Sequence, residues 1–236
     1  MALVVVKCGG AASELRPADT ILPLHAAGER VCVVHGAGPQ ISDEMERRGL
    51  EVRFVGGRRY TSPETLDVVR DSLAEVNARL VSMLGSSAVG MQGDEAGLRA
   101  SRIDELGHVG EPVSSAPPAI VDALSAGQIP VVTPLARGPL NVNADDAAAA
   151  LAIGLGADRL LFLTDVPGVL VAGNVATRLE KTAVDTALAA GEFEGGIVPK
   201  LRAAARAAGH GIQAEIGKTQ VVATSASIGR EGTSGV

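Results

Sequence analysis

Two adjacent aspartates, Asp145 and Asp146, stand where an apolar run begins, a position in which carboxylates either cap a helix or hold cations. Asn143 is a candidate N-cap, the run 147–155 predicts a helix buried on most sides, and Gly156 is placed to end it. Acidic side chains are favoured in a first helical turn by the exposed N–H groups and the helix dipole. They would repel a phosphate bound there, so Asp145 could instead hold lysine side chains. This stretch alone does not decide between the two roles.

Three turns rich in glycine or acid follow predicted strands, and each could approach a phosphate. Strand 3–6 ends before Lys7-Cys8-Gly9-Gly10, strand 31–34 before His35-Gly36-Ala37-Gly38, and strand 159–164 before Asp165. At the carboxyl ends of parallel strands, glycines let backbone N–H groups come close to phosphate oxygens. Glycine after a strand is more often simple turn geometry, and the G-x-G-x-x-G dinucleotide fingerprint is absent. The turns therefore indicate a phosphate site without specifying it.

A predicted hairpin, formed by 51–55 and 58–61 around Gly56-Gly57, carries Arg59 near its tip. An isolated arginine in a hairpin is usually solvated. Beside a glycine-rich site, however, a guanidinium is well suited to grip a carboxylate through two parallel hydrogen bonds. Both interpretations stay open on the hairpin alone.

The elements that must position these residues alternate between strand and helix, which indicates right-handed crossovers in a parallel sheet. Further strands are predicted at 87–91, 129–133, 212–216 and 220–223, and helices at 18–28, 39–49, 63–83, 120–127, 182–190 and up to residue 208. Segment 93–117 indicates an irregular or hairpin-rich excursion over the sheet, and 168–174 indicates a second hairpin.

Composition limits the partners. The chain has 236 residues, 46% of them hydrophobic, which is enough for one large domain or two joined lobes. Aromatic residues make up 2% and the net charge is -6, which argues against nucleic acid and favours a small substrate. Cys8 and Cys32 lie in apolar runs without metal-ligand spacing and are predicted to be buried thiols. The first apolar run is too short for a signal peptide or a membrane span, so we expect a cytoplasmic protein.

Six motifs, taken in order, resemble those of the amino-acid kinase family. They are Lys7-Cys-Gly-Gly, His35-Gly-Ala-Gly-Pro-Gln, Gly57-Arg-Arg-Tyr-Thr, Asn141-Val-Asn-Ala-Asp, Thr164-Asp-Val-Pro-Gly-Val and Gly195-Gly-Ile-Val-Pro-Lys. The similarity runs from Met1 to about Gly211, and the order and spacing are most like the branch that phosphorylates N-acetyl-L-glutamate. Ala37 stands where a third glycine is common, Ile197 replaces a usual methionine, and the sequence after Gly211 matches poorly.

The resemblance implies a three-layer αβα sandwich with a mainly parallel eight-stranded sheet, in a single domain over 1–236. The amino-terminal lobe (about 1–134) would take the amino-acid substrate, and the carboxyl-terminal lobe (about 135–236) would take the nucleotide. The implied activity is phosphorylation of the γ-carboxylate of N-acetyl-L-glutamate with ATP and Mg2+, in arginine biosynthesis. The alternatives are a kinase for carrier-protein-linked aminoadipate or glutamate, and a non-catalytic relative that binds a ligand. The presence of both family lysines disfavours the non-catalytic alternative.

The roles that the resemblance implies fall on three groups of residues. The catalytic group consists of Lys7 and Lys200, which match the lysines that stabilise the transferring phosphoryl group, and Asp145, which matches the aspartate that orients them. The substrate group consists of Gly36, Ala37, Gly38, Arg59, Asn141 and Asn143. The nucleotide group consists of Gly9, Gly10, Thr164, Asp165, Val166, Gly168, Val169 and Ile197. No residue is assigned as a metal ligand.

The implied chemistry needs no general base, because a carboxylate is already ionised at neutral pH. Positioning, together with charge neutralisation by the lysines and Mg2+, suffices. His35 and His108 are accordingly expected to be structural.

Helix 63–83 has an apolar stripe at steps of three and four, formed by Leu66, Val69, Leu73, Val76, Leu80 and Met83. By itself the stripe fits a core helix and a dimer interface equally well. We expect a homodimer through it, since a two-fold interface requires a self-complementary face. The arginine-inhibited hexamers of the family carry an additional helix before the first strand. Only Met1 and Ala2 precede Leu3, so no such hexamer is expected.

Overall fold

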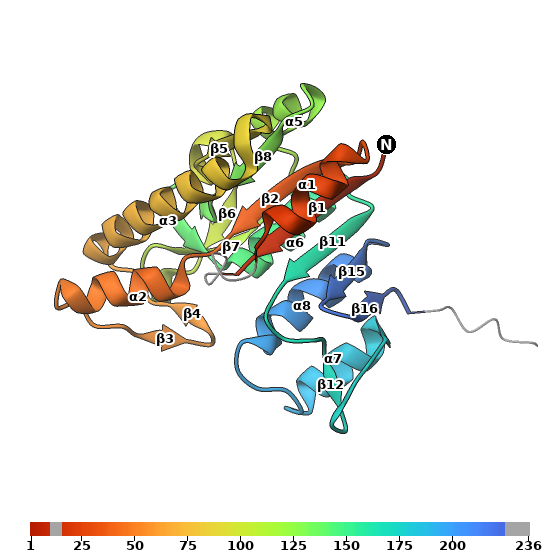
Figure 1. The fold of residues 1–236 in the computed structure, drawn as a ribbon. Coiled ribbons are helices and arrows are strands. Elements are labelled where there is room, and N and C mark those ends of the chain that lie inside the picture. The colour runs from red at the N-terminus through yellow and green to blue at the C-terminus, as the bar shows by residue number, and fades with distance from the viewer. Residues whose placement is uncertain (10–15, 225–236) are drawn as a thin grey trace, which may run out of the picture.

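The computed structural model describes residues 1–9 and 16–224 and is centred on an eight-stranded sheet (Figure 1). The strands stand in the order β14-β16-β15-β11-β1-β2-β8-β5. Their bounds are β1 Leu3–Cys8, β2 Arg30–His35, β5 Ala88–Met91, β8 Ile129–Val132, β11 Arg159–Leu163, β14 Arg178–Glu180, β15 Gln213–Ile216 and β16 Thr219–Val222. Neighbouring strands run parallel except β15 with β16. The predicted mainly parallel eight-stranded sheet is thereby confirmed.

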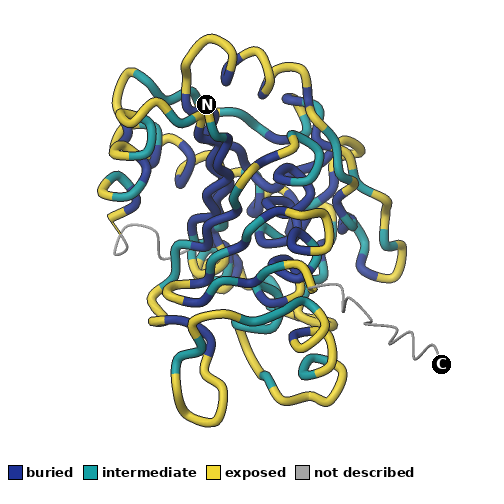
Figure 2. The backbone as a smooth tube through the Cα atoms, turned by 90° about the vertical axis from the view of Figure 1, so that its right-hand side faces the viewer, coloured by how far each residue is buried: buried dark blue, intermediate teal, exposed yellow. Residues whose placement is uncertain are grey.

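Strands β1 and β2 alternate their side chains between two hydrophobic clusters, one on each face of the sheet. In β1, Leu3 and Val5 belong to one cluster and Val4 and Val6 to the other. The first cluster is covered by α5 (Pro118–Ser125), α6 (Ala144–Leu155), α7 (Lys181–Ala189) and α8 (Ile197–Ala208), and the second by α1 (Ala18–Ala26), α2 (Gly38–Arg47) and α3 (Pro63–Leu84). Helices on both faces form the predicted three-layer sandwich, in which β1 is buried along its whole length (Figure 2).

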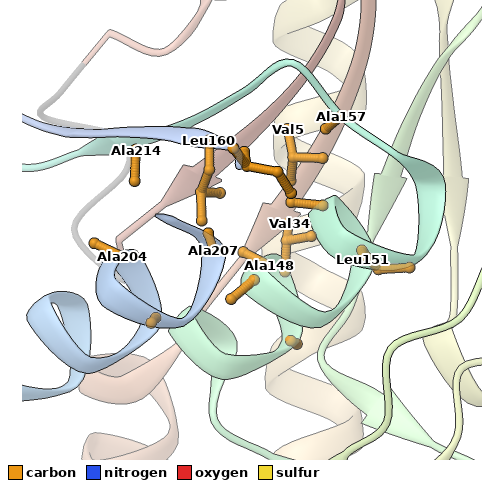
Figure 3. Packing of buried hydrophobic residues seen from close by; sticks show 14 of the residues in the cluster. Val5, Val34, Ala148, Leu151, Ala157, Leu160, Ala204, Ala207 and Ala214 are labelled. Atoms are coloured by element: carbon orange, nitrogen blue, oxygen red, sulfur yellow. The ribbon is translucent and has the colours of Figure 1, made fainter. Parts of the chain in front are cut away.

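Helices α6 and α8 lie side by side because small side chains line their contact. The buried alanines are 147–150 and 152 in α6, and 203–205, 207 and 208 in α8. Figure 3 shows Ala148 and Leu151 of α6 beside Ala204 and Ala207 of α8, packed against the sheet. Because the alanine side chain is small, two helices that meet through alanines can pack closely against each other. The packing therefore fixes the two helices relative to each other.

A second sheet of four strands, in the order β6-β7-β10-β9, occupies the segment that the sequence left irregular. It is built from β6 (Ala100–Arg102), β7 (Val109–Pro112), β9 (Leu135–Ala136) and β10 (Leu140–Val142), with α4 (Gly93–Ala96) and the 3-10 turns η1 (Gly85–Ser87) and η2 (Asp104–Leu106) nearby in the chain. Strands β6 and β7 form an antiparallel hairpin, as expected of this excursion. Both other predicted hairpins are present, as β3 (Phe54–Val55) with β4 (Arg58–Arg59) and β12 (Leu170–Val171) with β13 (Asn174–Val175).

The apolar stripe of α3 faces the core, so the dimer interface predicted on it is wrong. Leu66, Val69, Leu73, Val76 and Leu80 are buried in the second cluster, and of the six stripe residues only Met83 is exposed, by 42%. The outer face of α3 carries charged side chains, among them Asp67, Glu75 and Arg79. Burying the stripe within one chain satisfies its hydrophobic face without a partner. The homodimer stays a prediction without an assigned surface.

Cys8 and Cys32 are free and buried, as predicted. Burial raises the pKa of each thiol to about 12, so both are neutral at physiological pH. Among the helices that the structure describes, none is both long and apolar enough to cross a bilayer.

His35, the last residue of β2, is fully buried and lies on the α3 face of the sheet. Its Nε2 is 3.0 Å from the amide nitrogen Nδ2 of Asn77, which also donates to the carbonyl of Val131 at 2.8 Å. The Asn77 amide is a donor, so Nε2 accepts and the ring is neutral. Burial is the main cause that lowers the pKa of His35 from 6.5 to about 4. These contacts fit the expected structural role.

The buried imidazole should make the protein sensitive to acid. Unfolded His35 takes up a proton below about pH 6.5 whereas folded His35 resists it until about pH 4, so its contribution to stability is complete above the unfolded pKa and is lost as the pH falls. In that window the free energy of unfolding should fall by up to about 1.4 kcal/mol per pH unit from this group. The free energy of unfolding, measured with denaturant, should change less steeply with pH in His35→Gln than in wild type. Glutamine keeps a hydrogen-bond acceptor for Asn77. His210→Gln, at an exposed histidine, is the control. Equal pH slopes in wild type and His35→Gln would show that His35 does not cause the acid sensitivity.

Candidate active site

The register of the sheet brings three predicted turns to one edge. Cys8 at the end of β1 is paired with His35 at the end of β2 and with Leu163 at the end of β11. The turns that follow these strands therefore start side by side. Helices α6 and α8 precede the parallel strands β11 and β15, so both helices also begin at this edge. Parallel α/β sheets place their ligands beyond this edge.

Alternation along β1 decides where Lys7 points. Leu3 and Val5 belong to the cluster under α6 and α8, and Lys7 follows at the same two-residue spacing. Its ammonium group lies 2.8 Å from Oδ1 of Asp145, an ion pair by distance although its angles are not those of a hydrogen bond. The two side chains are only 7% and 6% exposed, respectively. This pair connects the central strand to the start of α6.

Lys200 completes the cluster from the first turn of α8. Its Nζ lies 3.5 Å from Oδ2 of Asp145, so each carboxylate oxygen faces one lysine. Burial, followed by the positive charge of Lys7, lowers the pKa of Lys200, against the attraction of Asp145 and Asp165. The structure thus brings together all three residues that were predicted to be catalytic, in a region of positive charge that favours an anion.

Capping of α6 falls to Asn143 and not to Asp145. The side-chain oxygen of Asn143 accepts hydrogen bonds from the backbone N–H groups of Asp145 at 2.9 Å and Asp146 at 3.2 Å. Gly156 ends the helix in the left-handed conformation, as predicted. Because the cap is provided by its neighbour, the Asp145 carboxylate is left to hold the lysines. Of its two possible roles, the structure shows that of a lysine partner.

A cavity of about 490 Å³ opens beside this cluster and is lined by all six residues of the predicted substrate group. Its lining includes Lys7, Asp145, Gly36, Ala37, Gly38, Arg59, Asn141 and Asn143. Apolar walls are provided by Ile41, Leu73, Val109, Pro134 and Val142. A cavity of this volume, lined by both polar and apolar residues, is typical of small-molecule sites.

Arg59 is a buried cation whose guanidinium lines the cavity. It donates to the carbonyl of Gly38 at 3.1 Å and to the hydroxyl of Ser42 at 2.8 Å, and it stacks over the ring of Phe54 at 4.7 Å. None of the carboxylates in the described part of the chain forms an ion pair with it, and burial lowers its pKa. A buried guanidinium without a carboxylate partner provides a site for a ligand anion.

Asn141 and the glycine turn are also held in defined positions. The side-chain amide of Asn141 in β10 donates to the hydroxyl of Thr61 at 3.1 Å. Gly38 is the first residue of α2 and Ala37 its N-cap, where helical N–H groups lack partners inside the helix. Ala37 is buried in the second hydrophobic cluster and also lines the cavity, which stays open beside it.

The residues predicted to bind nucleotide divide into two sets. Gly9, Thr164, Asp165, Val166 and Ile197 lie in turns at the carboxyl edge or in the first turn of α8 and are partly or fully exposed. Gly168 and Val169 are buried: a Cβ on Gly168 would meet Thr219 Oγ1 at 2.7 Å, and the Val169 N–H donates to that same hydroxyl. The carbonyl of Val169 accepts from Ala176, so its backbone groups serve the fold. Gly10 lies outside the described residues.

The sequence did not single out a group of charges at the side of the cavity, where Arg58 is part of the lining. Arg58 of β4 forms ion pairs with Glu111 of β7 and with Asp146, whose carboxylate is 3.2 Å away. Burial, and secondarily the charge of Glu111, raises the pKa of Asp146, while Arg58 opposes this shift. A signal was present, because adjacent residues on a strand point to opposite sides, so Arg58 and Arg59 had to have different partners.

The chain is similar in sequence to known proteins. Residues 2–218 match the model of the amino acid kinase family. An acetylglutamate kinase of Saccharopolyspora erythraea is 42% identical over 237 residues, covering 89% of this chain and 78% of the relative, and one of Halorhodospira halophila is 40% identical, covering 89% and 80%.

Solved structures share the fold. The structure of smu.665 from Streptococcus mutans superposes with a TM-score of 0.85 at 26% identity, covering 94% of this chain and 99% of the other. Carbamate kinase from Giardia lamblia bound to AMP-PNP gives a TM-score of 0.70 at 14% identity, covering 94% and 99%, a likeness of fold alone. On the match of the family model and the identity to these relatives, the chain belongs to the amino acid kinase family.

Proposed function

We propose that this protein transfers the γ-phosphoryl group of ATP to the γ-carboxylate of N-acetyl-L-glutamate, forming an acyl phosphate for arginine biosynthesis. The observation that carries the proposal is the Lys7–Asp145–Lys200 cluster at one end of a cavity that Arg59 lines without a carboxylate partner. Relatives about 40% identical over most of the chain are named for this reaction. A dicarboxylate suits this cavity, since one carboxylate can reach the lysines while Arg59 binds the other.

The acceptor carboxylate attacks the γ-phosphorus directly, and the bond from that phosphorus to the bridging oxygen of ADP breaks. No proton must be removed, because the carboxylate is ionised at neutral pH. Lys7 and Lys200 offset the negative charge that spreads over the transferring group, while Asp145 holds both ammonium groups in place before the reaction. The residues of this chain thus act by position and charge.

The nucleotide would lie at the carboxyl edge of the sheet, in the lobe formed by residues 135–236, with the amino-acid substrate in the lobe 1–134. The N–H groups at the start of α2 would face the phosphates. Thr164, Asp165, Val166 and Ile197 would border the rest of the nucleotide. In the described part of the chain no three His, Cys, Asp or Glu side chains cluster as a metal site. Mg2+ would therefore arrive with ATP, held mainly by phosphate oxygens and water, and would neutralise their charge.

Trapping of the product with hydroxylamine tests the function. An acyl phosphate reacts to a hydroxamate, so the assay with ATP and Mg2+ should give hydroxamate with N-acetyl-L-glutamate and much less with free or carrier-linked glutamate and aminoadipate. Faster turnover of a free or carrier-linked acceptor would reassign the substrate. If no acceptor is turned over, the non-catalytic alternative, a protein that only binds a ligand, would be favoured.

Lys7→Ala and Lys200→Ala should each lower kcat by about 100-fold or more, with a smaller effect on KM, because each charge matters most as the phosphoryl group transfers. Lys→Arg should not restore activity, since a planar guanidinium does not replace a compact ammonium. Steady-state kinetics measure both constants. Lys181→Ala, at a lysine paired with Asp185 outside the cavity, serves as the control. An unchanged kcat in either alanine variant would remove that lysine from the mechanism.

Asp145→Asn should fold but lose most of its activity, because the amide keeps the shape of the side chain and removes the charge that holds both lysines. We expect kcat to fall by at least about tenfold, as for loss of a charge-assisted contact. Thermal unfolding and kcat should be measured together, with Glu75→Gln on the exposed face of α3 as the control. Wild-type turnover with a lowered unfolding temperature would make Asp145 a purely structural residue.

Arg59→Ala should raise KM for N-acetyl-L-glutamate by about tenfold or more, because the loss of a bidentate carboxylate contact acts on that substrate. KM for ATP should stay within about twofold. Initial rates at varied concentrations of each substrate separate the two constants. Equal increases in both would indicate that Arg59 supports the lobe and does not bind the substrate.

A further inference from the structure

The hairpin β3–β4 carries two adjacent arginines that hold it from different sides. Arg59 bonds to Gly38 and Ser42, which belong to α2. Arg58 turns toward β7 and the start of α6. The hairpin is thus connected to α2 by one arginine and to α6 by the other.

The ion pair of Arg58 with Asp146 is largely shielded from solvent, whereas the side chain of Glu111 is 44% exposed. The NH2 group of Arg58 contacts Glu111 Oε2 and lies 3.2 Å from Asp146 Oδ2. The side chain of Asp146 is 10% exposed and that of Arg58 24%. Ion pairs that are partly buried are screened less by salt than those on the surface, so they hold a geometry more firmly.

Each member of this group is connected to the active site, two of them through their sequence neighbours and Glu111 through helix α8. Arg58 is next to Arg59, and Asp146 is next to Asp145. Glu111 also faces Arg206 at 4.0 Å, on the helix α8 that carries Lys200. Arg206 in turn donates to the hydroxyl of Ser114 at 3.1 Å and to the carbonyl of Pro112 at 3.3 Å. The group therefore connects the elements that hold both ends of the cavity.

In the described part of the chain, backbone hydrogen bonds join the hairpin to the rest of the molecule at its base. Thr61 donates to the carbonyl of Leu106 at 3.0 Å and accepts from His108 at 2.7 Å. The outer strand is weakly packed, with Phe54 56% and Val55 44% exposed. The tip consequently depends on the side-chain contacts of the two arginines.

We propose that Arg58 is a positioning residue for substrate binding: through Glu111 and Asp146 it fixes the distance between Arg59 and the Lys7–Asp145–Lys200 cluster. A substrate held at both ends needs that distance to be set before it binds, because ordering the hairpin afterwards would weaken the affinity. Arg58 also lines the cavity, but its guanidinium is held by Glu111 and Asp146, so we assign its effect to the placement of Arg59 and not to contact with the reacting atoms. The kinetic part of the proposal rests on the proposed function.

Two kinetic comparisons test the mode of action. Arg58→Ala and Glu111→Gln should both raise KM for N-acetyl-L-glutamate by about fivefold to tenfold, while KM for ATP stays within about twofold. Glu111 does not line the cavity, so an increase in Glu111→Gln cannot come from lost substrate contact. In the Arg59→Ala background, Arg58→Ala should add little, because the residue it positions is gone. Arg79→Ala, which removes an exposed ion pair with Glu75, is the matched control and should behave as wild type.

Hydrogen–deuterium exchange of the free protein gives a readout independent of activity. Peptides covering 52–60 should exchange faster in Arg58→Ala and Glu111→Gln than in wild type and Arg79→Ala. Unchanged exchange would overturn the proposal, whatever the substrate. A KM that rises in Arg58→Ala but not in Glu111→Gln would overturn the proposal in favour of direct substrate binding by Arg58. If the increases in KM of Arg58→Ala and Arg59→Ala multiply in the double variant, the two arginines act independently and the proposal is also overturned. Absence of turnover in wild type would count against the proposed function alone, and the exchange result would still decide the role of Arg58.

Discussion

One buried carboxylate shared by two lysines is the interaction on which the site depends. Two ammonium groups this close would repel each other, and Asp145 offsets that repulsion with one oxygen toward each. Two positive charges and one negative charge leave one net positive charge at the end of the cavity. Removing one partner of such a buried pair typically costs about 3–5 kcal/mol, so the cluster also ties β1, α6 and α8 together. The ion pairs with Asp145 therefore both stabilise the fold and hold the two lysines where they would contact the transferring phosphoryl group.

The packing of the sheet and helices makes this cluster possible. The two-residue alternation of β1 turns Lys7 to the face that α6 and α8 cover. The alanines of these helices allow them to lie close together, and their place before parallel strands brings both of their first turns to the carboxyl edge. The small side chains between the helices thus bring the charged side chains at their first turns close together.

Much of this could be predicted from the sequence, and the failures have physical causes. Strong local signals, such as Asn143 before an apolar run and glycines after buried strands, gave the fold and the cap correctly. The stripe of α3 was ambiguous because periodicity reveals that a face is buried and not what buries it. The sheet that contains the hairpin of segment 93–117 was not predicted, because β7 pairs with β10, which lies outside the segment. The position of Val169 in a motif could not show that its N–H donates to Thr219, fifty residues away. The alternation of β4 indicated that Arg58 and Arg59 point to opposite sides, but the partners of Arg58 lie in distant elements that a local pattern does not identify.

The central claim is that a substrate carboxylate attacks phosphorus directly between the two lysines. Oxygen tracing tests it: N-acetyl-L-glutamate labelled with 18O in its γ-carboxylate is incubated with ATP, Mg2+ and hydroxylamine, and the released phosphate is examined by 31P NMR. Direct attack makes a labelled oxygen the bridge of the acyl phosphate, and hydroxylamine then displaces it with the phosphate. The account predicts phosphate that carries one 18O atom when the substrate is fully labelled. Phosphate without label, released at the rate of ATP consumption, would show attack by water and contradict the account.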